Sequence, residues 1–172
     1  MAQPGFQTQV SKDPAIGVPG DKASLNVCIY TDRNYVAGDG KVTIGQFVWF
    51  DPSNPTEFHG TGILNALSTG AAGAKPLGIV QRNLSAVNYD IMSGATMVVP
   101  EGSALNVVIK GDLYAQAATA ATRGQKVFAV LADGSLKTGA AGATIAGAIE
   151  TSFEVKDGGD AGDLITISSW GV

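Results

Sequence analysis

The sequence has few of the side chains on which most catalytic and metal sites depend. Its 172 residues include a single histidine, His59, and a single cysteine, Cys28. A cysteine-rich zinc site and a disulfide within the chain are therefore excluded. A nucleophile activated by histidine could use only His59 as its base. We therefore expect no enzymatic activity, no metal site and no cofactor.

Charged side chains and long apolar runs are also scarce. Charged residues make up 15% of the sequence and the net charge is −4, so attraction to nucleic acid or to an anionic membrane surface is not expected. No apolar run approaches the roughly 20 residues of a membrane-spanning helix. Residues 1–20 lack the basic and apolar pattern of a secretory signal. An unpaired Cys28 suits synthesis in a reducing cytoplasm.

Glycine, by contrast, is abundant, and it divides the chain into short segments. The 23 glycines, together with Asp, Asn and Pro, separate runs rich in β-branched residues, which is typical of many short strands joined by turns. Such strands must cover two apolar faces. We therefore predict an all-β fold, a β-sandwich or partly closed β-barrel, formed by residues 21–172 as a single domain. The nine predicted strands are residues 25–30, 42–50, 77–82, 95–99, 105–110, 113–116, 126–131, 148–155 and 163–170.

Alternation within some of these strands predicts which face is buried. In residues 149–155, Phe153 and Val155 share one face and Glu150 and Glu154 share the other, the pattern of a half-buried strand. The alanine-rich residues 115–122 are expected to form a loop or a strand extension, because they are too short and lack the amphipathic stripe of a stable helix.

The first 20 residues differ from the rest. They follow neither the strand period nor the helix period, and Pro4, Pro14 and Pro19 favour extended backbone. We predict an extended N-terminal arm over residues 1–20. The alternative is a terminus that stays disordered.

Three features could carry chemistry but have simpler explanations. His59 lies near Asp51 and Glu57 and could act as a general base, but no nucleophile motif accompanies it, so a solvated loop is favoured. The acidic loop 157–163 is similar to the calcium-binding loop of an EF-hand. That loop needs an acidic residue at its twelfth position, and counting from Asp157 this position is Ser168. An acidic turn is favoured there.

The third feature is the aromatic run FVWF at residues 47–50, which could stack against a sugar. In a strand this run is apolar on both faces, which favours a place in a core or at a subunit contact.

A series of short segments runs in order along almost the whole chain and resembles the structural cement proteins of tailed-bacteriophage capsids. They include FQTQV at 6–10, GQFVWFDP at 45–52 and AGDLITIS at 161–168. The others are residues 14–17, 19–24, 78–80, 97–102, 110–114, 124–129, 133–134 and 150–153. Residues 54–75 match no such pattern, and their role stays open.

The resemblance implies a virion protein that is assembled in the host cytoplasm and sits on the outer surface of the capsid. Its expected partners are the major capsid protein, whose neighbouring subunits it would clamp, and other copies of itself, as a homotrimer or, less favoured, a dimer. The arm would dock on a neighbour through Phe6, Val10, Ile16 and Val18. Neither nucleic acid nor a membrane is an expected partner.

Two other functions remain open at this point. One is a surface module that binds glycans or a host receptor through Tyr30, Tyr35, Trp49 and Tyr89. The other is a hydrolase that uses His59 with a nearby carboxylate.

Overall fold

The computed structural model describes residues 16–32, 35–37, 42–49, 63–64, 75–83, 97–100 and 102–171. All regular secondary structure in these residues is β-strand, and none of them forms a helix that could cross a membrane. The strands are β1 (Ile29–Tyr30), β2 (Tyr35–Ala37), β3 (Phe47–Val48), β4 (Ile63–Leu64), β5 (Gly78–Gln81), β6 (Ala104–Lys110), β7 (Asp112–Gln116), β8 (Lys126–Val130), β9 (Leu136–Gly139), β10 (Ala148–Asp157) and β11 (Leu164–Ser168).

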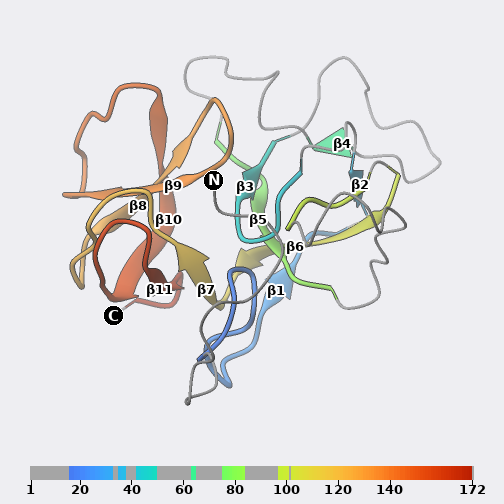
Figure 1. Cartoon of the computed structure of the whole chain (residues 1–172), viewed down its shortest axis with the longest axis horizontal. Helices are drawn as coiled ribbons and strands as arrows, with labels where there is room; N and C mark the ends of the chain where they lie inside the picture. Colours follow the sequence, from blue (N-terminus) through green and yellow to red (C-terminus); the bar gives the residue numbers. More distant parts are fainter. Residues whose placement is uncertain are drawn as a thin grey trace, which may run out of the picture.

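The strands form two sheets (Figure 1). One has the order β3-β5-β6-β2-β4, with β1 added beside β6, and the other has the order β7-β11-β10-β8-β9. Neighbouring strands are antiparallel except for β2 and β4, which are parallel. The sheets do not close into a barrel, so of the two predicted all-β architectures the structure has the sandwich type.

The chain passes from the first sheet to the second at Gly111. This residue alone separates β6 from β7, and it is buried. A Cβ atom at this position would lie 2.8 Å from Cys28 Sγ and 3.2 Å from Val108 Cγ1. A side chain at this position would therefore push against Cys28 and Val108, and glycine avoids that overlap.

The buried side chains form two clusters. The larger one joins the sheets, because Phe47 and Ile79 of the first sheet pack in it with Leu113, Phe153 and other residues of the second. The rings of Phe47 and Phe153 meet edge to face, with 5.9 Å between centroids. The smaller cluster belongs to the first sheet and includes Val80, Val107 and Leu105.

Most predicted strands are confirmed within a few residues of their ends. Phe153 and Val155 are buried, as the alternation in β10 predicted. Residues 115–122 continue β7 and then form bridges at Ala117 and Ala121, with no helix. Three strand predictions were too long. Residues 25–30 contain only the two-residue β1, and the described residues 42–49 contain only the two-residue β3 and a bridge at Thr43. Within 95–99, the described residues 97–99 show only the partner of that bridge, Val98. The strands β2, β4 and β9 were not predicted from the sequence.

Candidate assembly surfaces

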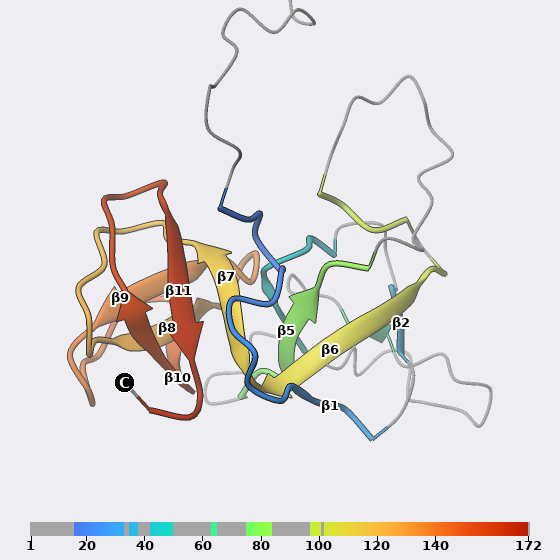
Figure 2. The same ribbon diagram turned by 90° about the horizontal axis from the view of Figure 1, so that it is seen from below.

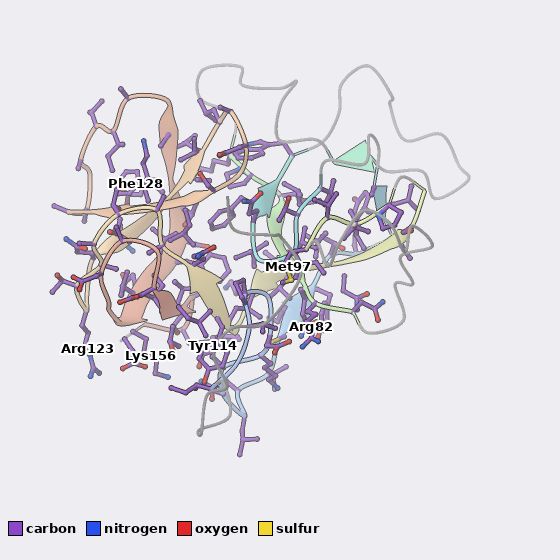
Figure 3. The ribbon with its side chains drawn as sticks, in the orientation of Figure 1. Arg82, Met97, Tyr114, Arg123, Phe128 and Lys156 are labelled. Atoms are coloured by element: carbon purple, nitrogen blue, oxygen red, sulfur yellow. The ribbon has the colours of Figure 1, made fainter. Side chains whose placement is uncertain are left out.

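Residues 17–23, which we call the arm root, are fastened to both sheets. Gly20 N donates a hydrogen bond of 2.7 Å to Tyr114 O on β7, and Gly20 O accepts one of 3.0 Å from Arg82 N, next to β5. The root continues along β7, where Ala23 N donates to Asp112 O. Figure 2 shows this segment running between β7 and β5 toward β1, and Tyr114 and Arg82 are labelled beside it in Figure 3.

Gly20 allows this close fit. Its φ is +85°, a conformation that residues with a Cβ atom adopt at a cost. Gly20 is buried against Ile44, Val80 and Arg82. On its surface side the root is held by Asp21, whose carboxylate lies 3.4 Å from the Arg82 guanidinium. Because this pair is partly exposed, it adds little stability.

Two of the four predicted arm contacts, Ile16 and Val18, lie within the described residues, and their settings differ. Ile16 is 86% exposed, so the chain enters the root from solvent. Val18 is half-buried in a turn, where its carbonyl oxygen accepts a hydrogen bond from Asp21 N. Phe6 and Val10 lie outside the described residues. The assignment of all four as capsid contacts, and the boundary between arm and domain at residue 20, remain predictions.

Asp112 is a buried charge that holds the turn after the root. Its Oδ2 accepts hydrogen bonds of 2.7 Å from Ser24 Oγ and from Asn26 Nδ2, and the Lys156 ammonium lies 3.3 Å away. Its Oδ1 is buried with no hydrogen-bond partner among the described residues. Asp112 therefore connects the turn at residues 24–26 to β10 as well as to β7.

The surroundings of Asp112 favour its charged form. Burial alone would raise the pKa of the carboxyl group, but interactions with Ser24, Ser168, Asn26 and Lys156 outweigh it. Together they hold the pKa below its ordinary value of 3.8. The carboxylate is therefore ionised at neutral pH, as its partners require.

The turn held by Asp112 presents an apolar surface, which we call the ridge. Leu25 is fully exposed and Val27 is 70% exposed. The Trp170 indole covers one side, where its Nε1 donates a hydrogen bond to Val27 O and the Lys110 ammonium lies 5.8 Å from its ring centroid. The ridge consists of Leu25, Val27, Ile29, Tyr30 and Trp170.

An apolar groove lies between the two sheets, with a volume of about 440 Å³. β10 forms one wall, and its register against β8 shifts between Glu150 and Glu154. Within this irregular stretch, Thr151 Oγ1 donates a hydrogen bond to Val127 O. The lining residues are Phe47, Lys75, Pro76, Leu77, Gly78, Ile109, Ile149, Glu150, Thr151, Ser152 and Phe153.

These surfaces account for all the exposed large hydrophobic side chains in the part of the chain that the structure describes. Five of the seven form the ridge, Ile109 lines the groove, and Ile16 leads into the root. Contiguous exposed apolar side chains mark interaction surfaces. The geometry therefore favours binding to another protein.

The alternative sites receive less support. Trp49 and Tyr35 are 3% and 4% exposed, so a sugar platform on these aromatic side chains is wrong. The prediction that residues 47–50 lie in a core or at a subunit contact is confirmed as a core position for residues 47–49, and Phe50 lies outside the described residues. His59 and Tyr89 lie outside the described residues. In the acidic loop, Asp163 Oδ2 accepts a hydrogen bond from Asp160 N. Across the described ranges, no three His, Cys, Asp or Glu side chains are grouped as metal ligands.

Sequence reasoning missed both Asp112 and the ridge. Asp112 lies 86 and 88 residues from its partners Asn26 and Ser24, a separation that no local pattern reveals. The alternating apolar residues Leu25 and Val27 were interpreted as part of a strand with its apolar face in the core. Alternation shows that two residues share a face, but it does not show whether that face is buried or exposed to solvent.

Comparison with known proteins agrees with the all-β fold. A chain in the solved capsid of Myoviridae phage XM1 is similar over 95% of this chain and 96% of its own length, with a TM-score of 0.64 and 16% sequence identity. Likeness at this identity shows a shared fold. No curated protein matches the sequence. The profile of the family described as XM1 gp53 minor capsid protein matches residues 6–169, which is nearly the full length, and the chain therefore belongs to this family.

Proposed function

We propose that this protein binds the outer surface of a bacteriophage capsid and cements neighbouring major capsid subunits. As a member of a minor capsid protein family, it is a phage capsid structural protein. The outer location, the clamping of major capsid subunits and the assembly of several copies over a local symmetry axis are our proposal. The cement role needs no bond-making chemistry, in keeping with the scarcity of catalytic side chains.

The observation that carries this proposal is the attachment of the arm root to both sheets. An arm that grips a neighbouring subunit is pulled whenever the shell strains. Because Gly20 is hydrogen-bonded to Tyr114 of one sheet and to Arg82 beside the other, the pull is shared by the whole domain. Several copies held together multiply such weak contacts through avidity.

Particle stability tests the cement role directly. Capsids that carry the protein are expected to release their DNA at a higher temperature than capsids that lack it, because a ligand of the assembled shell stabilises it. Adding the purified protein back should restore the difference. An unchanged release temperature would contradict cementing.

The arm contacts can be tested with paired charge substitutions in the full chain. Phe6→Asp with Val10→Asp should weaken co-sedimentation with mature capsids by roughly a hundredfold or more, because burying each apolar side chain contributes about 1.5–3 kcal/mol. Gln7→Asp with Gln9→Asp adds the same charge at neighbouring positions and should weaken binding far less. Equal losses in both variants would argue against Phe6 and Val10 as anchors, and no loss in either would argue against the arm.

A further inference from the structure

We propose that copies of this protein join head to tail, with the ridge of one copy seated in the groove of the next. The inference deepens the proposed function, since it rests on several copies acting together on the capsid. It assigns one occupant to each apolar surface, namely a second copy of the same chain.

The two surfaces differ in shape, and this difference decides the symmetry. The ridge projects, with Leu25 and Val27 as its most exposed side chains, whereas the groove is a hollow with Leu77, Ile149 and Phe153 in its lining. A two-fold contact needs one surface that complements itself. A contact between two different surfaces is heterologous, and it closes into a ring when the rotation between copies fits. A ring of three is the homotrimer expected from the resemblance.

Charge complements the shapes. Lys22 precedes the ridge and Asp32 follows it, and both are exposed. The groove also carries one base and one acid, Lys75 and Glu150. A seated ridge can place Lys22 near Glu150 and Asp32 near Lys75. A partner surface that carried charges of only one sign would attract either Lys22 or Asp32 and repel the other. The presence of both signs in the groove therefore favours a second copy as the partner.

The scaffold makes both surfaces ready to bind. Asp112 fixes the turn that carries Leu25, and Trp170 fixes the backbone at Val27. In the groove, Glu150 Oε2 accepts a hydrogen bond of 2.7 Å from Gly142 N, which positions the carboxylate. Holding groups in place before binding reduces the entropy lost on association.

Mixing experiments test the head-to-tail arrangement. The ridge variant is Leu25→Asp with Val27→Asp, and the groove variant is Ile109→Asp. Their masses are measured by light scattering beside wild type, which is expected to be an oligomer. Each variant alone should be monomeric, with at least tenfold weaker association. An equal mixture should give a heterodimer, because an intact groove on the first variant still meets an intact ridge on the second.

Further variants keep the test decisive. Ser152→Arg fills the groove from an exposed position and replaces Ile109→Asp if that variant fails to fold. Ala132→Asp adds a charge at another exposed site and should leave the oligomer intact. A monomeric wild type, oligomeric ridge and groove variants, or a mixture that stays monomeric would each overturn the inference.

Co-sedimentation with capsids separates this inference from the proposed function. A ridge variant that stays oligomeric but no longer binds capsids would assign the ridge to the major capsid protein and overturn the inference alone. If the variants and their mixture behave as expected while wild type fails to bind capsids, the inference stands and the proposed function is wrong.

Discussion

Replacing Asp112 with alanine is expected to lower the free energy of unfolding by about 3 kcal/mol, because hydrogen bonds to buried charged groups contribute about 1.5–3 kcal/mol and their loss leaves partners unsatisfied. The substitution removes the acceptor that the Ser24 hydroxyl, the Asn26 amide and the Lys156 ammonium share. Urea denaturation measures the loss. The control is Asp160→Ala, at an exposed position, where a change within about 0.5 kcal/mol is expected.

The same carboxylate predicts how stability depends on pH. The pKa of Asp112 is lower in the folded protein than its ordinary value of 3.8, so the folded state binds this proton less tightly than the unfolded chain does. The stabilisation is complete above about pH 4 and is lost as pH falls through the folded pKa. The stability difference between wild type and Asp112→Asn should therefore be constant near neutrality and shrink below about pH 4. A difference that grows toward low pH would contradict this assignment.

Local patterns in the sequence were sufficient to predict much of the second sheet, to which β10 belongs. The alternation of apolar and polar residues predicted the buried face of β10, because a strand with one face in water carries its apolar side chains on the other face. The dipeptide Asp133-Gly134, a combination that favours tight hairpin turns, forms the turn between β8 and β9, with Gly134 at φ +73° and Ser135 N donating to the Asp133 carboxylate. Such features depend on residues close in the chain.

The remaining features depend on contacts between distant residues. β2 and β9 are only three and four residues long, too short for their own alternation to be read, and they exist because β6 and β8 pair with them. The burial of Asp112 depends on residues from the turn after the root and on β10. A propensity scale assigns Asp to the surface, so the sequence alone gives no reason to place this one inside.

Substituting Gly20 with alanine tests whether the arm root is as tightly fitted as the proposed function requires. Alanine at φ +85° is strained, and its Cβ would overlap Ile44 Cγ2 and lie 3.0 Å from Arg82 N. We expect a loss of about 2–4 kcal/mol in the free energy of unfolding, from backbone strain of about 1–2 kcal/mol together with displaced contacts.

Gly102→Ala is the matched control for Gly20→Ala, because Gly102 has φ +76° but open space around a Cβ atom. Gly102→Ala introduces the backbone strain without any steric overlap, so it should lower the free energy of unfolding by about 1 kcal/mol. The difference between the two variants isolates the packing of the root between the sheets. If that packing transmits force from the arm, Gly20→Ala should also lower the temperature at which capsids release DNA, although every arm residue from 1 to 16 is unchanged. Equal losses in stability for the two variants would mean that the root is loosely held, and the arm could then not transmit force to the two sheets as proposed.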